Sequence, residues 1–189
     1  MSTLCSTRRR CRLIAAGVLV VLAGTVGAVG AARYYAGSVR MAAALLGIRA
    51  AFRQVQQLST GELASWRADA RRQPLLIIDV REPAEFAISH LADARNVPWG
   101  SDWQQALKDT PKDQAIVVYC SIGYRSSVAA RQLQQAGFAQ VANLEGSIFK
   151  WASEGHPLQG ADGAAATRVH PYDATWGLLL APQLRAPLP

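Results

Sequence analysis

The chain has 189 residues, half of them hydrophobic, which allows one domain of ordinary size and an appendage. Its net charge of +7 comes from the first 57 residues, which hold eight arginines and no acidic residue, whereas the remainder holds 12 Lys or Arg against 13 Asp or Glu. A nearly neutral globular part argues against nucleic-acid binding. Cys5, Cys11 and Cys120 are too scattered for a disulfide framework, and neither they nor the three histidines have metal-ligand spacing.

The N-terminal segment predicts a membrane anchor. Residues 1–12 form a basic segment with four arginines, and residues 13–32 carry no charge. Twenty helical residues span about 30 Å, the thickness of a bilayer core. Arginines are denser before this stretch than directly after it, so the positive-inside tendency predicts a cytoplasmic N-terminus. The rest of the chain is then expected on the periplasmic, or extracytoplasmic, side of a single membrane span.

A cleaved signal peptide is the competing interpretation of residues 13–32. Glycines dilute the hydrophobicity of the stretch, and small residues near its end resemble a cleavage site. In that case the domain would be exported rather than anchored. Residues 33–57 follow, with apolar side chains at helical spacing. They predict a juxtamembrane amphipathic helix, which either lies on lipid headgroups or packs on the domain.

Residues 58–158 predict an α/β domain. Ser59 and Glu62 have the spacing of a helix-capping box. Apolar runs predict strands at 75–80, 115–119 and 140–144, and helical patterns start at Ser59 and Pro83 and cover 103–108, 126–136 and 146–154. Because strands and helices alternate, we expect a parallel sheet with helices on both faces. The tail, 159–189, is rich in Ala, Gly and Pro, and we expect part of it to dock on the domain or on the membrane.

The most informative stretch is AIVVYCSIGYRSS, residues 115–127. Cys120 ends the buried strand, and a short loop containing Gly123 then opens a helix. Open α/β sheets bind ligands at this edge. The loop N–H groups, the helix N-terminus and Arg125 would all favour a thiolate over a thiol. A lone cysteine is more often a small buried hydrophobe, so the prediction of a reactive site depends on the combination.

Four segments together resemble the rhodanese family of sulfurtransferases, in its single-domain form. They are DVREPAEF (79–86), SHLADARNVP (89–98), YCSIGYRS (119–126) and NLEGSIFKWASEGHPL (143–158). The resemblance covers residues 58–158 and implies a rhodanese-like fold that needs no cofactor. It also implies that Cys120 takes a sulfane sulfur from thiosulfate or a similar small donor and passes it to a thiol acceptor, small molecule or protein, or to cyanide. The turns at 89–94 and 146–147 depart from the usual family pattern.

The resemblance implies a site around Cys120 as the catalytic nucleophile. Its expected substrate-binding residues are Ser121, Ile122, Gly123, Tyr124, Arg125 and Ser126. Arg125 would bind the sulfonate end of the donor, and Tyr124 would shape the pocket mouth. Asp79 and Arg81, at the end of the neighbouring strand, are expected to orient the loop through hydrogen bonds. The alternative for these two is an ion pair that only closes the strand end.

Two other functions compete with this interpretation. A persulfide carrier or partner-binding module would hold sulfur on Cys120 without multiple turnover. A cysteine-dependent phosphatase or arsenate reductase also uses a cysteine loop that ends in an arginine, but with five residues between them. Here four residues separate Cys120 from Arg125, so the loop is small for a phosphate.

Overall fold

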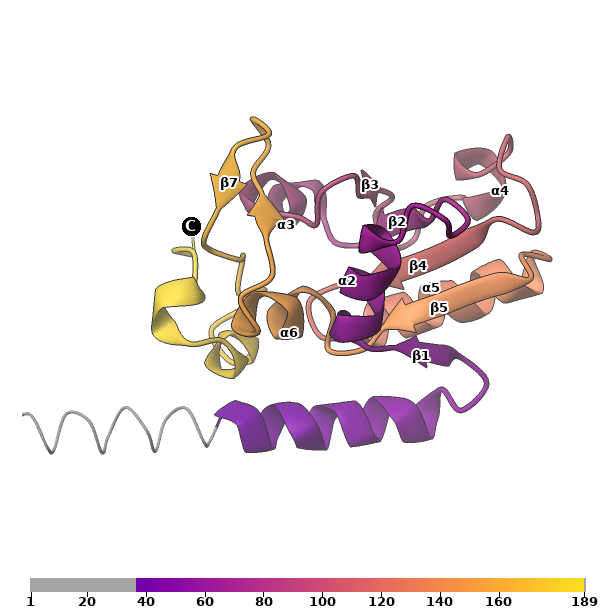
Figure 1. Ribbon diagram of the computed structural model, residues 1–189. Coiled ribbons are helices and arrows are strands. Elements are labelled where there is room, and N and C mark those ends of the chain that lie inside the picture. Colours follow the sequence, from indigo (N-terminus) through magenta and orange to yellow (C-terminus); the bar gives the residue numbers. More distant parts are fainter. Residues whose placement is uncertain (1–36, 189) are drawn as a thin grey trace, which may run out of the picture. The chain divides into compact units, whose positions relative to one another are not determined.

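The computed structural model describes residues 37–188 and contains a five-stranded, fully parallel sheet (Figure 1). The strand order is β1-β5-β4-β2-β3. The strands are β1 (Gln56–Leu58), β2 (Leu76–Asp79), β3 (Arg95–Asn96), β4 (Ala115–Tyr119) and β5 (Gln140–Leu144). The strands predicted at 115–119 and 140–144 are thus β4 and β5, and that predicted at 75–80 is a slightly shorter β2.

Helices flank this sheet as the alternating pattern predicts. They are α2 (Thr60–Ala68), α3 (Pro83–Ile88), α4 (Trp103–Ala106), α5 (Tyr124–Gln135) and α6 (Ser147–Ser153). In Figure 1, α2 lies in front of the sheet and α5 behind it. Every residue of β4 is buried, as expected of a parallel strand covered on both faces. The capping box is present: Ser59 Oγ accepts from the Glu62 N–H, and Glu62 Oε2 accepts from the Ser59 N–H.

The position of Cys120 follows from the strand order. β4 lies between β5 and β2, and the chain leaves β2 toward β3 but leaves β4 toward β5. The ends of β2 and β4 therefore flank the point where the connections diverge, which is where parallel α/β sheets bind ligands. β4 ends at Tyr119, so Cys120 lies at this point.

The segment before the domain differs from its prediction at one end. Residues 37–51 are helical, but the chain then turns, and Gln56–Leu58 pairs with β5 instead of continuing the helix predicted over 33–57. Ile48, Phe52 and Val55 are buried in the core. Of the two placements expected for this helix, the structure shows packing on the domain.

The C-terminal segment also packs on the domain. Leu158–Gln159 (β6) and Ala165–Ala166 (β7) form an antiparallel pair, followed by two 3₁₀ helices, η1 (Trp176–Leu179) and η2 (Pro182–Leu184). Val169 and Leu180 are buried in the main core, and the Val169 N–H donates to the Leu184 carbonyl at 2.7 Å. These contacts fix the segment that carries Tyr172 and Trp176.

Within residues 37–188, no helix has both the length and the apolar content needed to cross a membrane. The segment predicted to do so, 13–32, lies outside the described residues.

Replacing Phe52 tests whether the helix before β1 belongs to the folded domain. Phe52 is 4% exposed and packs its ring against Tyr124, with centroids 5.5 Å apart. Phe52→Ala should lower the free energy of unfolding of the full chain by about 3 to 5 kcal/mol, measured by urea denaturation. Leu46→Ala, at a position 67% exposed on the same helix, should change it by less than about 0.5 kcal/mol. Equal, small effects would contradict packing of this helix on the core.

Candidate active site

Cys120 lies at the bottom of a tight loop between β4 and α5, only 1% exposed. The Gly123 N–H donates to Sγ at 3.2 Å, and the Ser126 hydroxyl donates to it at 3.4 Å. Gly123 has φ +114°, and a Cβ there would lie 3.2 Å from Asn143 Nδ2. Glycine is therefore needed at this position for the loop to turn around the sulfur. The Cys120 N–H itself donates to Ser147 Oγ at 3.1 Å.

The surroundings of Cys120 favour its ionised form. Burial acts to raise the pKa of the thiol, but the charge of Arg125 and hydrogen bonds from Ser126 and Gly123 outweigh it, so the pKa lies below its ordinary value. The N-terminus of the 12-residue helix α5 directly follows the loop and adds partial positive charge. A thiolate is the nucleophilic form of cysteine, so these contacts prepare Cys120 for attack.

Arg125 is held by a buried carboxylate that the sequence did not identify. Its Nη1 and Nη2 donate to the two carboxylate oxygens of Glu85, on α3, at 2.8 and 2.9 Å, and Nη2 also donates to Ser121 Oγ at 3.0 Å. Burial disfavours both charges, yet their bidentate pairing lowers the pKa of Glu85 and raises that of Arg125. Both groups therefore stay ionised at neutral pH.

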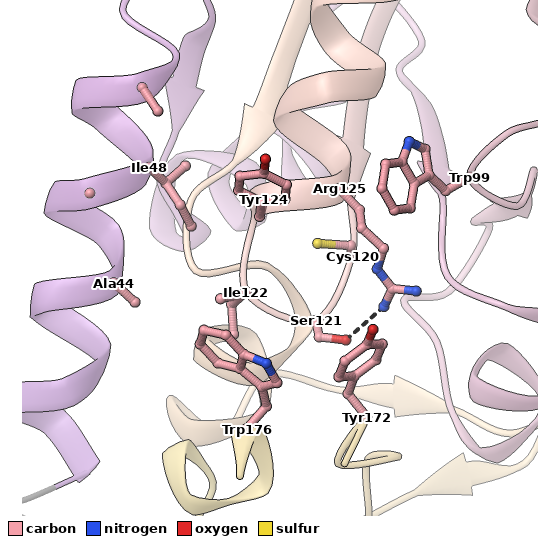
Figure 2. A pocket seen from close by; sticks show the side chains of 12 residues that line it. Ala44, Ile48, Trp99, Cys120, Ser121, Ile122, Tyr124, Arg125, Tyr172 and Trp176 are labelled. Atoms are coloured by element: carbon pink, nitrogen blue, oxygen red, sulfur yellow. Dashed lines mark hydrogen bonds between the residues drawn. The ribbon is translucent and has the colours of Figure 1, made fainter.

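A cavity of about 510 Å³ opens above Cys120 (Figure 2). Of the predicted substrate-binding residues, Ser121, Ile122, Tyr124 and Arg125 line it. The other lining residues come from the helix at 37–51, from the loop after β3 and from the C-terminal segment: Ala44, Gly47, Ile48, Ala51, Trp99, Tyr172 and Trp176. Tyr172 lies against Arg125, whose guanidinium carbon is 4.9 Å from the ring centroid.

A sequence model of the rhodanese-like domain matches residues 59–154 of this chain, half of its length. The chain belongs to the rhodanese-like family. The match contains the strands β2 to β5 and the whole cysteine loop. The lining residues from the N-terminal helix and from the C-terminal segment lie outside it.

Individual relatives agree with this assignment. A protein named sulfurtransferase from Allochromatium vinosum is 34% identical over 109 residues, which are 58% of this chain and 99% of that one. A probable adenylyltransferase/sulfurtransferase, MoeZ, from Mycobacterium tuberculosis is 35% identical over 97 residues, 51% of this chain but only 24% of that protein. The rhodanese-like domain of the Anabaena Alr3790 protein has a similar structure, with a TM-score of 0.51 and 27% identity over 55% of this chain and 78% of that one.

Two predicted substrate-binding residues of the rhodanese-like loop face the sulfur instead of the cavity. Neither Gly123 nor Ser126 lines the cavity. Ser126 is fully buried, and its single hydroxyl proton is shared between Asn143 Oδ1, at 2.6 Å, and Sγ, at 3.4 Å. These two residues thus stabilise the anion on Cys120, and the substrate would touch the other loop residues.

Asp79 and Arg81 do not orient the cysteine loop as expected. They form a fully buried ion pair, with Arg81 Nη2 at 2.7 Å from Asp79 Oδ2. The same nitrogen donates to the Ser89 carbonyl at 2.6 Å, so the pair ties the end of β2 to the end of α3. Among residues 37–188, neither side chain has a hydrogen bond to the loop at 120–126. The structure thus agrees with the alternative interpretation, an ion pair that closes the strand end, because two charges only two residues apart pair with each other.

The arrangement supports chemistry by the protein's own side chains. Buried Cys120 faces a cavity, donors directed at its sulfur favour the ionised form, and an arginine–carboxylate pair fixes the loop. In the part of the chain that the structure describes, no group of three His, Cys, Asp or Glu side chains is placed to hold a metal ion.

Removing the Ser126 hydroxyl tests how the thiolate is stabilised. Ser126→Ala deletes a hydrogen bond to Sγ, so the pKa of Cys120 should rise and less thiolate should be present at neutral pH. We expect the alkylation rate of Cys120 by iodoacetamide at pH 7 to fall about fivefold, and its pH profile to move to higher pH.

Ser127→Ala is the matched control. Ser127 is equally buried, but its hydroxyl donates to the Gly123 carbonyl and has no hydrogen bond to the sulfur. Its pH profile should stay at the wild-type position. The same displacement in both variants would mean that the loop geometry, and not the Ser126 hydroxyl, sets the pKa.

Proposed function

We propose that this protein is a sulfurtransferase that carries a sulfane sulfur on Cys120 and moves it from thiosulfate, or a similar donor, to a thiol or to cyanide. The observation that carries the proposal is the environment of Sγ, where the Gly123 N–H, the Ser126 hydroxyl and the Arg125 charge lower the thiol pKa at the bottom of a cavity. The relatives named sulfurtransferases support it.

In the first half-reaction the Cys120 thiolate attacks the outer sulfur of thiosulfate. A bond forms between Sγ and that sulfur, the sulfur–sulfur bond of the donor breaks, and sulfite leaves with the electron pair. The product is a Cys120 persulfide anion. The Gly123 N–H, which donates to Sγ, would favour this anion in the way that an oxyanion hole stabilises developing charge.

In the second half-reaction a nucleophile removes the outer sulfur. An acceptor thiolate, or cyanide in an assay, attacks it, the bond to Sγ breaks, and Cys120 returns as a thiolate. The product is an organic persulfide or thiocyanate. The thiolate that leaves in this step is stabilised by the same contacts that lower the pKa of Cys120. Those contacts therefore make Cys120 a good leaving group as well as a good nucleophile.

The geometry favours this chemistry over phosphate-ester hydrolysis. A phosphatase needs an arginine free to hold the equatorial oxygens of the substrate, whereas both terminal nitrogens of Arg125 donate to Glu85. The Gly123 N–H and the Ser126 hydroxyl both donate to Sγ. A persulfide carrier remains the second candidate, since it uses the same thiolate, and it differs from an enzyme only in lacking multiple turnover.

Cys120→Ser tests the proposal directly. The variant should form thiocyanate from thiosulfate and cyanide only at the uncatalysed rate, because serine cannot accept the sulfur. The wild-type protein, treated with thiosulfate alone, should gain the mass of one sulfur atom on Cys120. A double variant, Cys5→Ser and Cys11→Ser, is the control that should keep wild-type turnover. Turnover by Cys120→Ser would refute the proposal, and a sulfur atom gained without multiple turnover would identify a carrier.

We also propose, from the sequence of residues 1–32, that the protein is attached to the membrane with its domain on the extracytoplasmic side. A membrane-impermeant thiol reagent should then label Cys120 in intact cells, as identified by peptide mass spectrometry, and the labelled protein should sediment with membranes. Labelled protein in the released fraction would indicate a cleaved signal peptide. Labelling only after lysis would contradict both topologies.

A further inference from the structure

Half of the residues that line the cavity above Cys120 lie in segments outside the rhodanese-like match. One side is the helix carrying Ala44, Gly47 and Ile48, and another is the C-terminal segment carrying Tyr172 and Trp176 (Figure 2). Both segments are anchored in the core, as shown by the burial of Ile48 on one side and of Val169 and Leu180 on the other. The cavity is thus a fixed feature, and its volume of about 510 Å³ lies in the range that holds small organic ligands.

The charge of this cavity is already balanced. Among its lining residues Arg125 is the one basic side chain. Glu85 takes hydrogen bonds from both of its terminal nitrogens, and Tyr172 lies on it at 4.9 Å. An anionic ligand group would therefore find no uncompensated cation on the cavity wall. This argues against the expectation that Arg125 binds the sulfonate of a donor, and against a multiply charged acceptor.

The aromatic side chains of the cavity are incompletely covered. Trp99, Tyr124, Tyr172 and Trp176 are 39% to 52% exposed, although all of them lie around one opening. Exposed aromatic surface gathered at a concave site is the usual mark of a ligand with an apolar body. The opposite wall supplies only small or aliphatic residues, Ala44, Gly47, Ile48 and Ala51, which leaves the space between the walls open.

We infer that the sulfur acceptor is a small organic thiol with an apolar body, which binds between the N-terminal helix and Trp176 with its sulfur directed at Cys120. This inference rests on the proposed function and names its acceptor class. The acceptor thiolate attacks the outer sulfur of the Cys120 persulfide, the bond from that sulfur to Sγ breaks, and the electron pair leaves on Sγ. The acceptor thus becomes an organic persulfide, and Cys120 becomes a thiolate again. Its apolar body covers the exposed aromatic rings, which gives the binding free energy.

The test separates the two half-reactions. Cys120 is first loaded from thiosulfate, or from inorganic polysulfide, and the added sulfur is confirmed by intact mass. The loaded protein is then mixed with 2-phenylethanethiol or with 2-mercaptoethanol, and the loss of the sulfur is followed by mass. Each second-order rate constant is corrected for the thiolate fraction of the thiol. We expect 2-phenylethanethiol to react at least about tenfold faster than 2-mercaptoethanol. Burial of its phenyl ring in an apolar pocket should favour it by about that factor.

Variants on the two cavity walls test whether the cavity causes the preference for 2-phenylethanethiol. Trp176→Ala should reduce it severalfold, whereas Leu178→Ala, an exposed position on η1 that does not line the cavity, should leave it unchanged. Gly47→Leu should reduce it more than Gly47→Ala, because the larger side chain fills the open space. A Cβ at Gly47 meets no atom within 4 Å, and its backbone is helical, so both variants should fold.

The outcomes distinguish failure of this inference from failure of the proposed function. Equal corrected rates for the two thiols would overturn the inference while leaving sulfur transfer intact. A preference that neither Trp176→Ala nor Gly47→Leu changes would do the same, as would transfer to a protein thiol only. Failure of Cys120 to gain sulfur from either donor would overturn the proposed function itself, and the inference with it.

Discussion

Cys120 is buried, and the need to hold a negative charge on its sulfur is the constraint on which the rest of the site depends. A charge removed from water is destabilised by several kcal/mol unless nearby groups compensate it. Here the compensation is local: the Gly123 N–H and the Ser126 hydroxyl point at Sγ, and Arg125 adds a full positive charge. Arg125 is itself buried and needs Glu85, which brings α3 against the loop. The position of α3 relative to β4 thus affects how well a negative charge on Sγ is stabilised. The nearly neutral net charge of the domain as a whole does not enter directly.

Chemistry and specificity are divided between different parts of the chain. The cysteine loop and Glu85 lie inside the rhodanese-like match at 59–154, whereas much of the cavity wall lies on either side of it. The donors to Sγ face the sulfur and the wall residues face the cavity, and the two sets meet where Tyr172 of the wall packs on Arg125. The matched domain therefore holds the groups that favour a reactive cysteine, and the two flanking segments supply half of the residues that line the cavity above it.

Local patterns in the sequence predicted most of the fold but only part of the site. The strands at 115–119 and 140–144, the capping box at Ser59 and the loop after Cys120 depend on neighbouring residues, which a sequence displays directly. Strand β1 was missed because Phe52 and Val55 continue the helical spacing of the preceding residues, while the pairing of Gln56–Leu58 with β5 is a contact across more than 80 residues. Glu85 was missed for the same reason. In sequence it is an acidic residue in the first turn of a helix, a common and usually exposed position, and only the fold places it against Arg125, 40 residues away. The tail gave no periodic signal, so its contribution to the cavity followed only from its packing.

The direction of the loop donors decides what kind of substrate the site can recognise. In an oxyanion-binding loop the N–H groups point outward, to a ligand with several oxygens, and the arginine is free to join them. Here the Gly123 N–H and the Ser126 hydroxyl point inward to Sγ, and Arg125 donates to both carboxylate oxygens of Glu85. The site thus stabilises charge on sulfur held by the protein itself, and it offers the incoming molecule an apolar surface. In the proposed sulfur transfer, a donor would need only to present one sulfur to Cys120 and leave, whereas an acceptor would gain from contact with the cavity wall. The two half-reactions would then place different demands on their partners, and the flanking segments would act on the acceptor step.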